Sequence, residues 1–259
     1  MHLLEYNNDG EFSLTKFFFD DVPKYAILSH RWEADPEEEV TFRDLKDHTG
    51  KSKAGYNKIR FCGEQARRDG LPYFWVDTCC IDQTNSAELQ ETINSMFRWY
   101  RRADKCYVYL SDVSSPGFDT NNQLSRLSFE SAFRASTWFT RGWTLQELIA
   151  PRSVEFFSQE GNRLGDKKTL VRQVHDITGI AVSALQGASL SQFGVDERMS
   201  WAKNRQTKRE EDVAYSQLGI FDVFMPLIYG EGRDSALNRL KREINNSNNS
   251  LNGKRLPFT

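Results

Sequence analysis

The sequence has few cysteines and almost no net charge, and both shortages limit what the chain can be. Lys and Arg (34) nearly balance Asp and Glu (36), which leaves a formal charge of −2 over 259 residues. Such a chain offers no strongly basic surface for nucleic acid or an anionic membrane. Only four cysteines occur, and none forms a Cys-x-x-Cys pair. This argues against a zinc site or a secreted disulfide framework and favours a reduced, intracellular protein.

Long hydrophobic runs are missing as well. No stretch of about 20 apolar residues exists that could span a bilayer. The first residues, MHLLEYNNDGEF, carry acids and asparagines where a signal peptide needs a basic start and an apolar segment. We therefore expect a cytoplasmic protein with no membrane partner. What the chain does have is aromatic residues, 13% of the total, so a sizeable core can form.

Short apolar segments alternate with helical patterns in the first half of the chain. Three segments are apolar on both faces and predict buried strands: 25–28 (YAIL), 73–76 (YFWV) and 106–110 (CYVYL). Apolar residues at helical spacing predict helices over 56–69 and 85–102, the second with Asn85 and Glu88 as a capping box. This alternation predicts an α/β fold with a parallel sheet and right-handed crossovers.

The second half of the chain is mostly helical in pattern. Residues 112–137 predict a long excursion that ends in a short helix, and 154–158 (VEFFS) predicts another strand. Helices follow at 170–178, 197–203, 210–218 and 234–244. We expect an α/β core over 1–160, a helical part over 161–245, and a polar linker or tail over 246–259.

Polar side chains follow each predicted strand directly. The first strand is followed by Ser29, His30, Arg31 and Trp32, the second by Asp77, Thr78, Cys79, Cys80 and Asp82, and the third by Ser111 and Asp112. In open parallel sheets, ligands bind outside the carboxyl ends of the strands. The sequence therefore predicts a ligand site at this edge.

The segment RGWTLQELIAP, residues 141–151, predicts a short helix that could close this site. Leu145, Leu148 and Ile149 form one apolar face, so Trp143 and Glu147, four residues apart, share the opposite side. The indole would form a wall and the carboxylate would point at the ligand. The alternative is structural: a surface ion pair for Glu147 and plain packing for Trp143.

The other polar residues also have structural alternatives. His30 can be a satisfied buried histidine, Asp77 a loop anchor, and Cys79 a small apolar residue. A cysteine nucleophile paired with His30 is conceivable, but nothing in the sequence orients it. The glycine-rich phosphate-binding motifs and the Gly-x-Ser-x-Gly elbow are both absent.

Three blocks of the sequence carry a family resemblance. YAILSHRW, WVDTCCIDQ and RGWTLQELIAP resemble the signature blocks of the fungal HET (heterokaryon incompatibility) domain. Residues 198–232 resemble the helical continuation of HET domains attached to NOD-like (STAND) receptors. The resemblance implies a fungal protein whose activation triggers cell death on non-self recognition. It also implies C-terminal NACHT/STAND and repeat domains in a full-length chain.

The HET domain is in turn similar to the TIR domain, which has a flavodoxin-like fold. This similarity implies an NAD⁺ glycohydrolase with Glu147 as the catalytic residue. NAD⁺ or a related nucleotide would be the substrate, with no metal or other cofactor, and self-association would accompany activation. The implied substrate-binding residues are those at the strand ends and the helix start: Ser29, His30, Arg31, Trp32, Asp77, Cys79, Asp82 and Trp143. The alternative is a non-catalytic oligomerisation module that kills by recruiting partners.

Overall fold

A single mixed sheet lies at the centre of the computed structural model, which describes residues 1–7, 11–18, 21–115 and 123–253. Within these residues the sheet has seven strands in the order β2-β1-β4-β3-β5-β6-β7. Their bounds are β1 His2–Tyr6, β2 Phe12–Lys16, β3 Tyr25–His30, β4 Tyr73–Trp75, β5 Lys105–Tyr109, β6 Val154–Phe157 and β7 Arg163–Asp166. The three strands predicted first in the sequence are confirmed as β3, β4 and β5.

The sheet is parallel only in its middle. Strands β4, β3, β5 and β6 run parallel, whereas β1 pairs antiparallel with β4 and β7 pairs antiparallel with β6. The four parallel strands follow the order 2-1-3-4, which is how a flavodoxin-like sheet begins. The expectation of a wholly parallel sheet is therefore wrong at both edges. Short connections account for the antiparallel pairs β1–β2 and β6–β7, because a parallel partner needs a crossover of a dozen or more residues.

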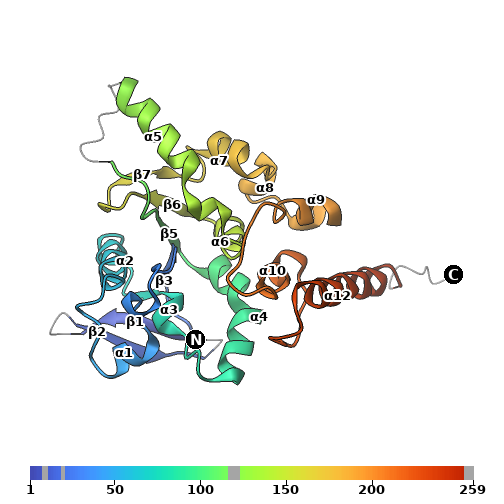
Figure 1. The fold of residues 1–259 in the computed structure, drawn as a ribbon, viewed down its shortest axis with the longest axis horizontal. Coiled ribbons are helices and arrows are strands. Elements are labelled where there is room, and N and C mark those ends of the chain that lie inside the picture. Colours follow the sequence, from blue (N-terminus) through green and yellow to red (C-terminus); the bar gives the residue numbers. More distant parts are fainter. Residues whose placement is uncertain (8–10, 19–20, 116–122, 254–259) are drawn as a thin grey trace.

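Helices cover both faces of the sheet. Helix α2 (Tyr56–Arg68) packs on β3 and β4 from one side, and α4 (Ser86–Arg102) and α6 (Thr144–Ile149) pack together on the other (Figure 1). The predicted helices 56–69 and 85–102 are thus confirmed to within one residue at each end. The predicted capping box is half formed. Asn85 accepts from the N–H groups of Ala87 and Glu88, but the Glu88 carboxylate bonds the Asp82 N–H instead.

Short helices make up most of the remaining chain. They are η1 Pro36–Glu38, α1 Phe42–Lys46, α3 Asp77–Cys80, α5 Gln123–Ala135, η2 Thr137–Thr140, α7 Val171–Thr178, α8 Val182–Leu185, η3 Leu190–Gln192, α9 Val195–Ser200, α10 Asp212–Tyr215, α11 Leu218–Phe221 and α12 Arg233–Gly253. Helix α7 ends at Gly179 with φ 68°, as the sequence predicts. The helix expected over 210–218 is instead the two short helices α10 and α11.

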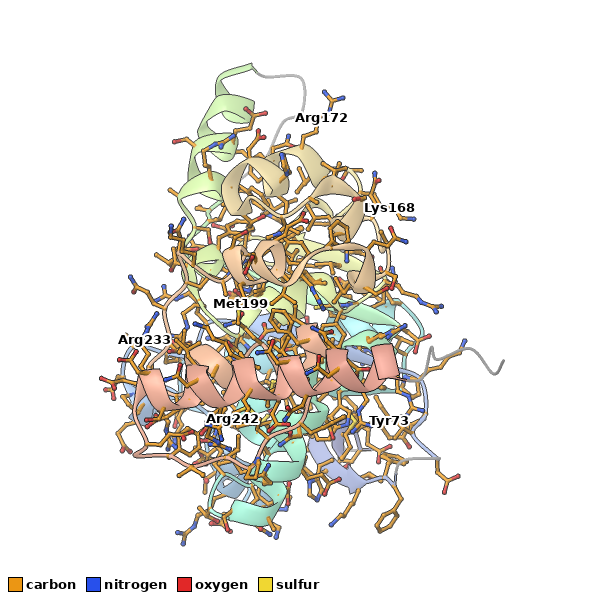
Figure 2. The ribbon with its side chains drawn as sticks, turned by 90° about the vertical axis from the view of Figure 1, so that its right-hand side faces the viewer. Tyr73, Lys168, Arg172, Met199, Arg233 and Arg242 are labelled. Atoms are coloured by element: carbon orange, nitrogen blue, oxygen red, sulfur yellow. The ribbon has the colours of Figure 1, made fainter. Side chains whose placement is uncertain are left out.

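Helix α12 is longer than the sequence predicts. It begins at Arg233 and continues to Gly253, inside the segment 246–259 that we expected to be a linker. Residues 254–259 lie outside the described residues, as do 116–122 of the predicted excursion. Figure 2 shows α12 running across one side of the molecule through Arg233 and Arg242, with the helices that carry Arg172 and Met199 above it.

The core is aromatic and contains all four cysteines. Trp75, Trp138 and Tyr100 are among its largest fully buried side chains. Every cysteine is buried and free, as expected for a chain without disulfides. Among the described residues, no group of three His, Cys, Asp or Glu side chains could hold a metal ion. None of the described helices is long and apolar enough to cross a membrane.

In the C-terminal part, helix α11 packs closely against α4, one of the helices that cover the sheet. Gly219 of α11 lies so close to α4 that an added Cβ would be 2.0 Å from Phe97 Cβ. We therefore expect Gly219→Ala to lower the free energy of unfolding by about 1–3 kcal/mol, because a packed interior must shift to admit the methyl group. Urea denaturation measures this.

The control for this prediction is Gly194→Ala. An added Cβ at Gly194 meets nothing within 4 Å, and φ there is an ordinary −61°. Gly194→Ala should lower the free energy of unfolding by less than about 1 kcal/mol, since only the helix-capping preference changes. Equal losses for the two variants would contradict close packing between α11 and α4.

Candidate functional site

The carboxyl end of the central strand β3 holds the first pair of candidate residues. Ser29 Oγ donates a hydrogen bond to Glu147 Oε2 at 2.5 Å, and Trp138 Nε1 donates to Ser29 Oγ at 2.9 Å. All three side chains are buried. The structure therefore brings Ser29 and Glu147 together across 118 positions of sequence. Trp138, which sequence reasoning missed, completes the chain of hydrogen bonds.

Glu147 points inward because α6 is covered on every side. All six of its residues, Thr144–Ile149, are buried, so the polar face expected on this helix is not exposed. The buried ammonium of Lys167 donates to the carbonyl oxygens of Leu148 (3.0 Å) and Pro151 (2.7 Å), which satisfies the helix C-terminus. Glu147 itself is 4% exposed, so its side chain is almost completely shielded from bulk solvent.

Burial shifts the acidity of both carboxyl groups near this edge. Desolvation and the nearby Asp77 carboxylate together raise the pKa of Glu147 to about 8, although Ser29, Arg141 and Arg205 oppose the shift. Desolvation also raises the pKa of Asp77 to about 6, opposed mainly by the hydrogen bond from Trp32. Glu147 is consequently protonated for the most part at neutral pH, while Asp77 is mostly ionised.

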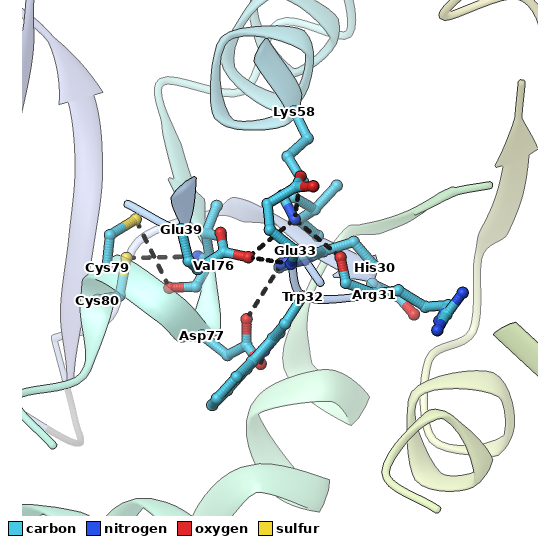
Figure 3. A network of polar contacts seen from close by, with 12 residues as sticks. His30, Arg31, Trp32, Glu33, Glu39, Lys58, Val76, Asp77, Cys79 and Cys80 are labelled. Carbon is cyan, nitrogen blue, oxygen red and sulfur yellow. Dashed lines mark hydrogen bonds and ion pairs between the residues drawn. The ribbon is translucent and has the colours of Figure 1, made fainter. Parts of the chain in front are cut away.

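Asp77 belongs to a second group of residues, shown in Figure 3, which includes His30, the neighbour of Ser29 in β3. The Trp32 indole N–H donates to Asp77 Oδ2 at 2.8 Å. His30 Nε2 lies 3.7 Å from Asp77 Oδ1, too far for a hydrogen bond, and neither of these buried atoms has another partner among the described residues. Burial, assisted by the Lys58 charge, holds the pKa of His30 well below its usual range. A neutral imidazole thus faces a carboxylate, and each keeps an unused hydrogen-bonding atom that is buried in this structure.

Lys58 fixes the loop that leaves β3. Its ammonium donates to Glu39 Oε2 and contacts Glu33 Oε1, both at 3.0 Å, and donates to the Arg31 carbonyl oxygen at 2.8 Å (Figure 3). The sequence carries a signal for the buried position of this lysine. Lys58 is four residues before Cys62, on the apolar stripe of its helix, where a charged residue needs buried partners.

The side chains of the remaining predicted site residues make their contacts outside these two groups. Trp143 Nε1 donates to Asp212 Oδ2 of α10 at 3.1 Å, so its indole faces the C-terminal part. Arg31 donates through Nη1 to Thr137 Oγ1 at 2.5 Å. Asp82 accepts from the N–H and hydroxyl of Thr84 in an exposed turn.

Cys79 is a packing residue in this structure. Its thiol is fully buried, with Sγ 3.9 Å from the Val76 carbonyl oxygen. Burial, together with the neighbouring Cys80, raises the pKa of the Cys79 thiol well above its usual range. Because the thiolate is the nucleophile, these surroundings argue against a cysteine-dependent hydrolase.

A hollow of about 400 Å³ lies on the α2 side of the same sheet edge. It is lined by Glu33, Ala54, Asn57, Lys58, Tyr109, Ser111, Gln159 and Glu160. These residues follow β3, β5 and β6 or begin α2, where an open α/β sheet places its ligands. Glu147 does not line this hollow. The expected crevice walled by Trp143 and Glu147 is therefore not the hollow observed here.

Comparison with known proteins identifies the family. Residues 25–132 match the family model described as "Heterokaryon incompatibility protein (HET)". This chain contains a HET domain. The matched part runs from β3 into α5 and includes Ser29 and Asp77, but it ends before α6 and Glu147.

A curated relative extends the similarity over almost the whole chain. The HET domain and its helical continuation are 58% identical over 252 residues to the vegetative incompatibility protein HET-E-1 of Podospora anserina. The alignment covers 97% of this chain and 18% of the relative, so the chain spans less than a fifth of that protein's length. No solved structure shows a significant match.

The raised pKa of Glu147 makes the stability of this HET domain depend on pH. In the unfolded chain the group titrates near 4.5, and in the folded chain near 8. Between these values the folded chain keeps a proton that the unfolded chain has lost, so stability falls as pH rises. For a single fully shifted group the slope is about 1.4 kcal/mol per pH unit. We expect Glu147→Gln to remove most of this dependence between pH 6.5 and 8, as measured by urea denaturation.

The matched control is Glu197→Gln, since Glu197 is exposed on α9. In this variant the free energy of unfolding should fall with pH as steeply as in the unaltered chain. Parallel pH profiles for the unaltered chain and Glu147→Gln would show that the carboxyl group is not buried as described.

Proposed function

We propose that this HET domain is the cell-death effector part of a heterokaryon incompatibility protein and acts by hydrolysing NAD⁺ at the nicotinamide–ribose bond. The observation that carries the proposal is the hydrogen bond between Ser29 at the end of β3 and Glu147 on α6. It joins two residues that the TIR resemblance names independently. The 2-1-3-4 order of the parallel strands is consistent with that resemblance.

Cleavage of the nicotinamide–ribose bond is favoured by a carboxylate next to the reacting ribose. Nicotinamide leaves as a neutral molecule from a cationic ring, and the ribose becomes oxocarbenium-like in the transition state. An ionised Glu147 stabilises that positive charge in a site poor in water. When the loop after β3 moves and uncovers them, the two atoms of His30 and Asp77 that lack partners bond ribose hydroxyls. Trp32, 36% exposed, stacks on a flat ring of the substrate. No redox cofactor is required, because NAD⁺ is consumed.

The structure corresponds to a resting state in this proposal. Glu147 is buried and holds its proton near neutral pH, so it neither reaches a substrate nor stabilises a cation. Activity therefore requires α6 or the loop after β3 to move, so that the carboxyl group loses its proton and reaches the substrate. Self-association of activated chains supplies this step, and an isolated monomer is nearly silent.

The second candidate function is a non-catalytic assembly module. One observation favours it: the 4% exposure of Glu147 and its bond to Ser29 are what a structural residue would show. Under this reading, killing depends on recruitment of partners, and nicotinamide is not released.

Nicotinamide release from NAD⁺, followed by chromatography, separates the two functions. The purified chain is assayed both as a monomer and fused to an oligomerising tag. We expect the oligomeric form to release nicotinamide and Glu147→Gln to be about 10²–10³ slower, the usual cost of removing one preorganised charge. Cys79→Ala is the control, and its rate should stay close to that of the unaltered chain.

Two outcomes would contradict the enzyme. One is a folded oligomeric chain that releases nicotinamide no faster than its Glu147→Gln variant. The other is undiminished killing by Glu147→Gln in fungal cells, which would support recruitment instead.

A further inference from the structure

The start of α6 is held from the C-terminal part of the chain by one buried arginine. Arg205 donates through Nη1 to the Arg141 carbonyl oxygen at 2.9 Å and to Thr144 Oγ1 at 2.8 Å, and through Nε to the Trp201 carbonyl oxygen at 3.3 Å. The residue is 6% exposed. A guanidinium in this position satisfies the turn that leads into the helix carrying Glu147.

The backbones of the two segments are in direct contact at this point. Gly142 N–H donates to the Gln206 carbonyl oxygen at 2.8 Å, and Gln206 N–H donates to the Thr140 carbonyl oxygen at 2.7 Å. A Cβ on Gly142 would lie 2.5 Å from Thr207 Cγ2, so the segments have no room to slide. A six-residue helix has little stability of its own. Its position is therefore set by what holds its ends.

Arg205 also brings a positive charge close to Glu147. Thr144, which accepts from Arg205, and Glu147 are three residues apart and share one side of α6. The second terminal nitrogen of Arg205, Nη2, is buried and has no partner among the described residues. A buried cation of this kind needs an opposite charge nearby. The effect is mutual: Arg205 lowers the pKa of Glu147, and although burial lowers the pKa of Arg205 to about 10, the Glu147 charge opposes that shift.

We propose that Arg205 is a positioning residue for Glu147: it fixes the start of α6 and supplies the buried positive charge that holds the carboxylate when Glu147 loses its proton. Its part in the reaction rests on the proposed function, whereas its coupling to Glu147 does not. The other titratable or charged groups that influence Glu147 or are influenced by it are Asp77 of α3, Tyr100 of α4, Cys106 of β5 and Arg141 before α6.

A double-mutant cycle against pH tests the coupling without any activity. Arg205→Met is made in the unaltered chain and in Glu147→Gln, and each protein is unfolded in urea at pH 6.5 and pH 9. We expect Arg205→Met to raise the proton affinity of Glu147 about tenfold, one pKa unit. Its destabilising effect should therefore be larger at pH 9, where Glu147 ionises, and should not depend on pH in the Glu147→Gln background.

Two further variants separate charge from packing. Arg205→Lys keeps the charge but loses the forked contacts, so it should be destabilised yet retain a nearly normal pH dependence. Arg242→Met, on the exposed side of α12, is the matched control. It should change neither the free energy of unfolding nor its dependence on pH. If Arg205→Met does not fold, Arg205→Gln replaces it in the same cycle. An equal cost of the Arg205 substitution at both pH values and in both backgrounds would overturn the proposal.

A kinetic measurement then tests the role in the reaction. In chains that release nicotinamide, Arg205→Met should move the acidic limb of the kcat profile about one pH unit upward and leave KM unchanged. A kcat that falls by the same factor at every pH, with no shift of the acidic limb, would show a merely structural role for Arg205. If the unaltered chain releases no nicotinamide, the proposed function fails, and the urea cycle still decides whether Arg205 is coupled to Glu147.

Discussion

The burial of one carboxyl group at the end of the central strand constrains everything around it. A buried acid needs hydrogen-bond partners and favours its neutral form, and Glu147 has Ser29 as a partner and a raised pKa. The helix that carries it is only six residues long and is fixed by Lys167 at one end and Arg205 at the other. The position of the candidate catalytic group is therefore a property of the whole fold, including its C-terminal part.

The interior of the fold could be predicted from the sequence because its signals are local. Strands β3, β4 and β5 are apolar on both faces, and α2 and α4 keep long helical stripes, so each can be recognised without knowledge of its partners. Strands β1, β2 and β7 could not be recognised in the same way. They are half polar, and their pairing is decided by the neighbouring strand and by short connections.

The candidate site likewise has some residues that local sequence signals predict and others whose contacts they do not. Polar residues after strands β3 and β4 could be expected at one edge, and the structure places Ser29, His30 and Asp77 there. Helical spacing put Trp143 and Glu147 on one side of α6, but spacing alone does not say which neighbour each side chain meets. The indole contacts Asp212 in a segment about 70 residues further along. Such a contact has no local signature.

The borders of the sheet limit how copies of this protein can assemble. Each border is an antiparallel strand of four or five residues, with Lys16 in β2 and Arg163 and Asp166 in β7. Short, charged border strands are poor templates for adding a strand from another molecule. If copies of the domain associate as proposed above, contact through helices and loops is then favoured over strand addition, and such an assembly can be reversible and stoichiometric, unlike growth of a cross-β fibre.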